Sequence, residues 1–172
     1  MTLDMGPAGG AGITADGNRW TLVFIRDFRQ PPSVVWAALT DPAQLDRWAP
    51  FRPARPLDET GDTTLTQVDG AERTDDPATV RRAEAPVLLE YSWGDDLLRW
   101  ELAAVGGGTR LTLRHTLTQP GVEAMVAAGW HICAEVLRRL LDGEPVGVIR
   151  GGQARRSGFD ELRAGYAKLL TT

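Results

Sequence analysis

The stretch VLLEYSWGDDLLRWELAAVGGGTRLTLRHTLT, residues 87–118, decides the fold. It holds three runs in which apolar and polar residues alternate, at 87–93, 97–105 and 109–118, and turns that contain Gly separate them. Alternation with a period of two is typical of a β-strand that buries one face. Because the turns are short, the three strands are predicted to pair in sequence as an antiparallel meander.

The same alternation predicts which side chains point into the protein. In the run 109–118 the leucines share a face with His115, so this histidine is expected to point inward. The two preceding runs place Tyr91, Trp93 and Trp100 on their inward faces. Two interpretations stay open for these residues. They are either core residues, with His115 satisfied by hydrogen bonds, or polar and aromatic anchors for a ligand.

Residues 122–141 carry the longest helical pattern in the chain. Apolar residues recur there at steps of three and four, which predicts an amphipathic helix with Met125, Trp130 and Cys133 on its apolar side. A buried thiol such as that of Cys133 is expected to behave as a small hydrophobic group. His131 lies toward the polar side of the helix and is expected to be solvated.

The part of the chain before the meander predicts one strand followed by two short helices. Residues 19–29 alternate as in a strand, with Arg26 on the same face as the inward apolar positions. Prolines end this strand, and VVWAAL at 34–39 predicts a short helix. Asp41 and Pro42 open a second helix, because Asp can cap a helix and Pro suits its first position.

Two more strands are predicted between these helices and the meander. Residues 63–68 and 78–85 alternate as strands, whereas the polar run 69–77 is predicted to be a loop. The pair Asp95-Asp96 resembles two catalytic carboxylates. Its position in a tight turn favours a turn-forming role instead.

The two ends of the chain differ from its middle. Residues 1–18 are rich in Gly and Ala and lack the basic start and apolar run of a signal peptide, so we predict a flexible tail. Residues 19–143 are predicted to form the folded domain. Residues 144–172 are predicted to be a C-terminal extension whose short helix, at about 159–170, packs on or near that domain.

The composition excludes several classes of protein. A chain of 172 residues with 42% hydrophobic and 24% charged residues is the size and composition of one ordinary globular domain. A net charge of -4 argues against a nucleic-acid-binding protein, which usually has a basic face. No apolar run is long enough to span a membrane, so a cytoplasmic location is expected. Lys168 is the only lysine beside many arginines, a bias typical of GC-rich bacterial genomes.

Four segments resemble a known family. They are PPSVVWAALTDPAQLDRWAP at 31–50, LEYSWGDDLLRWEL at 89–102, GGTRLTLRHTL at 107–117 and GWHICAEVLRRLLDG at 129–143. In this order they resemble the branch of the START/SRPBCC (Bet v allergen-like) superfamily that is related to the activator of heat-shock-protein-90 ATPase. The resemblance implies an α+β helix-grip fold. In that fold a curved antiparallel sheet wraps around a long C-terminal helix, and two short helices follow the first strand.

The resemblance implies a fold more strongly than a function, because members include ligand carriers, cyclases and hydrolases. A sheet that faces a single helix leaves a wedge that can hold an apolar cavity. The leading hypothesis is therefore non-catalytic binding of a small hydrophobic or amphipathic ligand between the sheet and the C-terminal helix. Its predicted lining is Tyr91, Trp93, Trp100, His115, Met125 and Trp130.

Two other functions are considered. Similarity to the family's namesake implies a chaperone partner, although no sequence feature marks the surface that would bind it. A cyclase or hydrolase would need acid–base groups in the cavity, and His115 with Tyr91 is the inward pair available, so the sequence assigns no catalytic residue. No cofactor is expected, and two histidines with one cysteine make no persuasive metal site. A homodimer is expected only as a general tendency of soluble proteins.

Overall fold

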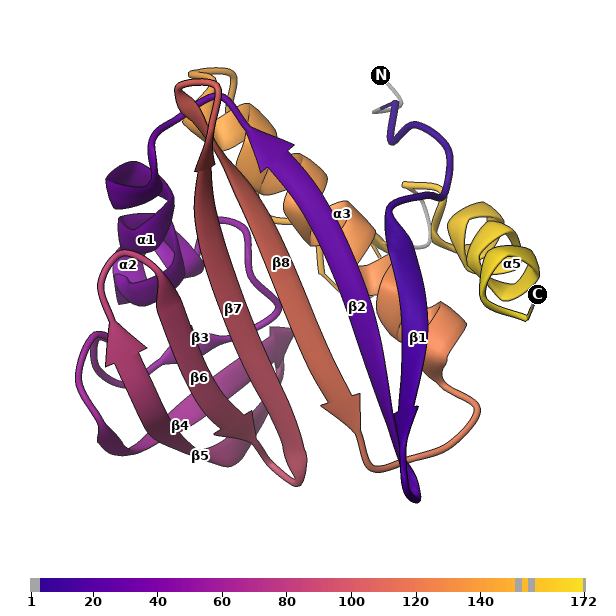
Figure 1. The fold of residues 1–172 in the computed structure, drawn as a ribbon, viewed down its shortest axis with the longest axis horizontal. Helices are drawn as coiled ribbons and strands as arrows, with labels where there is room; N and C mark the ends of the chain where they lie inside the picture. The colour runs from indigo at the N-terminus through magenta and orange to yellow at the C-terminus, as the bar shows by residue number, and fades with distance from the viewer. Residues whose placement is uncertain (1–3, 151–152, 155–156, 172) are drawn as a thin grey trace.

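A computed structural model describes residues 4–150, 153–154 and 157–171 (Figure 1). The strands are β1 Ala11–Asp16, β2 Arg19–Phe28, β3 Arg52–Pro53, β4 Gly61–Asp69, β5 Glu72–Glu84, β6 Leu88–Trp93, β7 Asp96–Val105 and β8 Gly108–Leu117. The helices are α1 Pro32–Thr40, α2 Pro42–Leu45, α3 Glu123–Leu141 and α5 Phe159–Leu170. Among the described residues, no helix is long and apolar enough to cross a membrane.

The strands form one antiparallel sheet in the order β1-β2-β8-β7-β6-β5-β4-β3. Figure 1 shows α3 crossing one face of this sheet, while α5 lies beyond the β1 edge. Helix α5 packs against both α3 and β1, and α1 packs against β7 and β8. The predicted α+β helix-grip fold is therefore confirmed, including the meander β6-β7-β8.

Both short helices form, but α1 begins at Pro32, two residues before the predicted range, whereas α2 begins as its sequence predicts. Pro32 occupies the first turn of α1, and Pro42 occupies the first turn of α2. The Asp41 side chain accepts a hydrogen bond from the backbone N–H of Ala43 at 3.1 Å, which caps α2. These helices let the chain leave β2 at one side of the sheet and re-enter it at β3.

The core lies between the sheet and α3, as the alternation predicts. On β8, His115 is 2% exposed and shares the inward face with the buried Leu111, Leu113 and Leu117. The inward residues of β7 and β6 are buried as well, and they include Trp100. The apolar face of α3 closes this core from the other side.

The polar run at 69–77 is not a loop, so that prediction was wrong. Strand β5 begins at Glu72, and only Gly70 and Ala71 form the turn after β4. This strand needs no apolar alternation, because here β4 and β5 are held by backbone pairing and by polar cross-strand contacts. The Thr66 hydroxyl, for example, donates to Asp75 at 2.7 Å.

The prediction that residues 1–18 form a flexible tail was also wrong for residues 4–18, the part that the structure describes, in which Met5 is buried. Residues Ala11–Asp16 form β1, which pairs with β2 through a two-residue turn at Gly17 and Asn18. Gly17 has φ 61°, and Gly at the first central position is typical of tight hairpin turns. The strand is short, and its apolar residues are small apart from Ile13, so its alternation is hard to tell from a tail rich in Gly and Ala. Pairing with β2 and contact of Ala11 and Ile13 with the core hold it in place.

Candidate functional site

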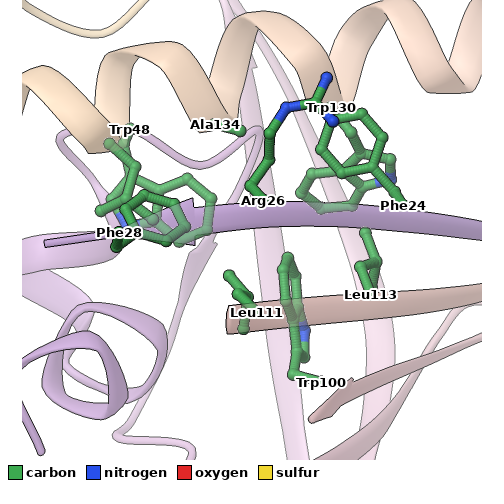
Figure 2. A pocket seen from close by; sticks show the side chains of 10 residues that line it. Phe24, Arg26, Phe28, Trp48, Trp100, Leu111, Leu113, Trp130 and Ala134 are labelled. Atoms are coloured by element: carbon green, nitrogen blue, oxygen red, sulfur yellow. The ribbon is translucent and has the colours of Figure 1, made fainter. Parts of the chain in front are cut away.

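The middle of the wedge between sheet and helix is filled by side chains. The remaining cavity is about 10 Å³, which is room for about one water molecule. Figure 2 shows Trp100, Leu111 and Leu113 extending from the sheet toward Trp130 and Ala134 of α3. The Trp100 and Trp130 rings meet edge to face, with centroids 5.4 Å apart. A ligand therefore has no room at this place.

A cleft of about 800 Å³ opens at the end of the wedge. Its walls are the N-terminal half of α3, the ends of β4 and β8, the β6–β7 turn, and the chain that follows α3. The apolar lining residues come mainly from α3 and from the chain beyond it. They are Pro50, Val68, Trp93, Leu117, Val122, Met125, Val126, Trp130, Ile132, Cys133, Ile149, Ala154 and Phe159.

A chain of hydrogen bonds crosses the floor of the cleft. The indole N–H of Trp130 donates to Nδ1 of His115 at 3.0 Å, and Nε2 of His115 lies 2.7 Å from Oδ2 of Asp96. The other carboxylate oxygen of Asp96 accepts from the backbone N–H and the hydroxyl of Thr118. Trp130 can only donate, so Nδ1 of His115 accepts and the ring proton sits on Nε2, facing Asp96.

These hydrogen bonds fix the charge of Asp96 and the tautomer of His115. Partial burial raises the pKa of Asp96, but the hydrogen bonds from His115 and Thr118 outweigh that effect, so its pKa lies below the ordinary value. Asp96 is therefore a carboxylate at neutral pH, and His115 is held as one neutral tautomer. Neither nitrogen of His115 can exchange a proton with a molecule in the cleft without breaking one of these bonds.

A second carboxylate, that of Asp76, also lines the cleft and is held in place. Oδ2 of Asp76 accepts from the indole N–H of Trp93 at 3.1 Å and from the amide of Gln67 at 2.7 Å. Arg150 also lines the cleft, but its guanidinium donates to the backbone carbonyls of Asp46 and Ala49. The cleft therefore combines a mainly apolar lining with the hydrogen-bond acceptors of Asp76 and Asp96.

Four of the six predicted lining residues line the cleft, and two lie elsewhere. Trp93, His115, Met125 and Trp130 line the cleft. Tyr91 and Trp100 lie in the packed core instead, where the indole N–H of Trp100 donates to the Tyr91 hydroxyl at 3.1 Å. Tyr91 is 1% exposed, and burial raises the pKa of its hydroxyl above the ordinary value.

Sequence reasoning missed Asp96 as a site residue because it assigned the Asp95-Asp96 pair to a turn. The turn is Gly94 and Asp95, whereas Asp96 is the first residue of β7. Alternation along β7 places Asp96 on the same face as Leu98 and Trp100, so the signal was present. Asp76 was missed because its strand was taken for a loop.

The prediction that His131 is solvated was wrong. Its side chain is 5% exposed, because α5 and the N-terminal segment cover that side of α3. Cys133 is buried as expected, and burial raises the pKa of its thiol to about 12. In the part of the chain that the structure describes, no three His, Cys, Asp or Glu side chains lie close enough together to hold a metal ion.

A family model agrees with this geometry. The model described as "Activator of Hsp90 ATPase homolog 1-like protein" matches residues 29–142, which include most of the sheet and all of α3. No curated protein matches the chain.

Solved structures show the same fold at low sequence identity. CalU16 from Micromonospora echinospora is 22% identical, with 91% of this chain and 94% of that chain covered at a TM-score of 0.67. A conserved protein of unknown function from Enterococcus faecalis, EF2215, is 15% identical, with 94% and 90% covered at a TM-score of 0.71. The AHSA1-like protein from Aeromonas hydrophila is 22% identical, with 72% and 92% covered at 0.60.

Proposed function

The chain belongs to the activator of Hsp90 ATPase homolog 1-like family, and we propose that it binds a small hydrophobic or amphipathic molecule in the cleft beside α3. The observation that carries this proposal is the cleft itself. Its volume of about 800 Å³ lies within the range of about 300–1,000 Å³ that is usual for ligand sites. The large aromatic side chains Trp93 and Trp130 supply apolar contact area.

The polar groups of the cleft favour an amphipathic occupant over a purely apolar one. Asp76 and Asp96 are held in place by neutral donors, so their remaining lone pairs can accept hydrogen bonds from a ligand. The occupant would place its apolar part against α3 and its donor groups toward Asp76 and Asp96. The engaged nitrogens of His115 favour binding over acid–base catalysis.

Gly129 provides a sharp test of the cleft. It lies on α3, lines the cleft, and a Cβ atom added there would meet nothing within 4 Å. Gly129→Phe should therefore fill the cleft without displacing the core. We expect the neutral apolar probe N-phenyl-1-naphthylamine to bind the unaltered protein, as measured by its fluorescence, and to bind the Gly129→Phe variant at least about tenfold more weakly.

Gly129→Ala is the matched control. It should keep probe binding and stabilise the protein by about 1 kcal/mol, because Ala favours a helix over Gly. Equal probe affinity for the Phe and Ala variants would contradict the proposal. Failure of the probe to bind the unaltered protein would shift attention to a chaperone partner, which the family description also supports.

A further inference from the structure

Four segments that are distant in sequence meet at one cluster on the side of α3 that faces α5. The members, called the latch from here on, are Arg26 of β2, His131 of α3, Tyr166 of α5, and the backbone carbonyls of Met5 and Gly9. Nε2 of His131 bonds to the Met5 carbonyl, and Nδ1 of His131 lies 2.8 Å from the Tyr166 hydroxyl. Arg26 donates to Tyr166 at 2.8 Å and to the Gly9 carbonyl at 3.0 Å.

These contacts fix the protonation of His131. The Met5 carbonyl can only accept, so Nε2 of His131 carries a proton. A guanidinium nitrogen of Arg26 lies 3.3 Å from Nδ1 of His131 and can only donate, so Nδ1 is the acceptor. The Tyr166 hydroxyl, 2.8 Å from Nδ1, also donates to the Gly9 carbonyl at 3.1 Å. The latch therefore holds a neutral imidazole, because a second proton on Nδ1 would face the Arg26 cation.

The other charged groups around His131 do not relieve this conflict. A small cavity beside the ring is lined by Asp27, Glu135 and Arg138 as well as Arg26. Asp27 is paired with Arg110 on the outer face of the sheet, and Glu135 is paired with Arg138 and Arg139. The charged residues of α5 are exposed: Asp160, Glu161, Arg163 and Lys168.

Helix α5 links the latch to the cleft. Its first residue, Phe159, lines the cleft, and Tyr166 joins the latch two turns later. Leu162, between them, is 6% exposed and belongs to the core. The helix also lies close to the N-terminal segment, because a Cβ on Gly165 would come within 3.0 Å of the Ala8 side chain. Movement of α5 would therefore change a wall of the cleft.

We propose that the latch is a pH-sensitive device: protonation of His131 releases α5 and the N-terminal segment from α3 and opens the cleft. The effect on a ligand rests on the proposed function, whereas the release of α5 does not. In the released state His131 is solvated and takes up a proton near the ordinary histidine pKa of about 6.5. In the latched state it resists that proton, so acid shifts the population toward release.

The electrostatic balance supports this direction. Burial is the largest effect on the pKa of His131 and lowers it. The hydrogen bond to the Met5 carbonyl raises the pKa, the Arg26 charge lowers it, and Glu135 raises it least, so the pKa stays below its ordinary value. The pKa of His131 is lower in the latched state than in the released state. The latched state therefore has its full stability at pH values above the pKa of the solvated histidine. The stabilisation is lost as the pH falls below that value.

Hydrogen exchange measured by mass spectrometry tests the release of α5 directly. Peptides covering 159–170 should exchange at least about tenfold faster at about pH 5.5 than at about pH 7.5, after correction for intrinsic rates. The chain has two histidines, so NMR can follow the protonation of each ring in the same samples. Equal protection of α5 at both pH values, or a His131 ring that stays neutral throughout, would overturn the proposal.

Variants assign the effect to the latch. His131→Gln should abolish the pH difference in α5, whereas His115→Gln should keep it. Tyr166→Phe retains the buried ring but removes the hydroxyl, so α5 should exchange faster already at about pH 7.5. A pH difference that survives in His131→Gln would assign the effect to another group and overturn the proposal.

The probe N-phenyl-1-naphthylamine tests whether the latch controls the cleft. Its affinity for the unaltered protein should fall at least about fivefold between about pH 7.5 and 5.5, and His131→Gln should show no such fall. Equal affinity of the probe at both pH values would overturn the proposal that the latch controls the cleft. Absence of binding at both would contradict the proposed function, while the exchange result would still decide whether α5 is released.

Discussion

His115 illustrates how neighbours define what a side chain can do. A histidine alone is compatible with catalysis, with metal binding and with a structural role. Here Trp130 donates to one nitrogen and Asp96 accepts from the other, so the ring is a fixed bridge between α3 and the β6–β7 end of the sheet. The bridge orients the Asp96 carboxylate toward the cleft, which is the role we assign to His115.

Trp130→Phe should measure how much this bridge contributes to the free energy of unfolding. The substitution removes the indole N–H and leaves Nδ1 of His115 buried without its donor, which should destabilise the protein by about 1–3 kcal/mol. The midpoint of urea unfolding at constant slope checks this value. Trp20→Phe is the control, because Trp20 is 45% exposed and the change should cost less than about 0.5 kcal/mol. Equal losses in both variants would contradict the assigned role.

Residue burial was more predictable than residue partnership. Alternation alone placed His115, Trp100 and Tyr91 inward, and all three are buried. It could not predict that Tyr91 and Trp100 satisfy each other, because that contact depends on side-chain packing across β6 and β7. His131 was misplaced for a related reason, since helical periodicity identifies a polar side but not whether another segment covers it.

At the scale of elements, the strands that bury apolar residues were predictable and those held by pairing were not. The meander and α3 follow directly from periods of two and of three to four residues. The first half of β5 carries little apolar alternation, whereas β1 alternates but is short and built mostly of small residues. Their pairing is a long-range property, which single-sequence patterns do not contain.

Gly108 joins two elements by close approach of their backbones. A Cβ at this position would lie 2.2 Å from the carbonyl oxygen of Phe28, at the end of β2. Gly108→Ala should therefore force the strands apart and destabilise the protein by about 1–3 kcal/mol, which urea unfolding would detect.

Gly12→Ala in β1 is the matched control for this strand substitution. Nothing lies within 4 Å of a Cβ at Gly12, so this change should be neutral or stabilise by up to about 1 kcal/mol. If Gly108→Ala proved as harmless as the control, the close approach of β8 to Phe28 would be refuted.

At the scale of the whole molecule, both ends of the chain pack around the matched family region. The family model matches residues 29–142, so β1, β2 and α5 lie outside the match. Helix α5 was predictable from its own pattern, but its position on α3 was not. That position depends on Tyr166 finding His131 and Arg26, and these three residues are spread over most of the chain.

Deletion of residues 1–10 should therefore weaken the molecule at two places. It exposes the site of Met5, which is 8% exposed in the intact chain, and it removes the Met5 and Gly9 carbonyls from the latch. We expect the Tm to fall by on the order of 5 °C in a thermal scan at neutral pH. Met5→Leu keeps the carbonyl and the apolar volume, so its Tm should change little. An unchanged Tm in the deletion variant would contradict the packing of this segment.

Strand β1 has a further consequence for behaviour at high concentration. It is a short edge strand of 6 residues, and behind it lies β2, RWTLVFIRDF, with 10 residues rich in aromatic and β-branched side chains. Without β1, the N–H and C=O groups along one side of β2 would be left unpaired, and such an edge is a template for other chains. Proteolytic removal of the residues up to Asp16 would therefore expose the β2 edge of the sheet, and that edge could nucleate aggregation.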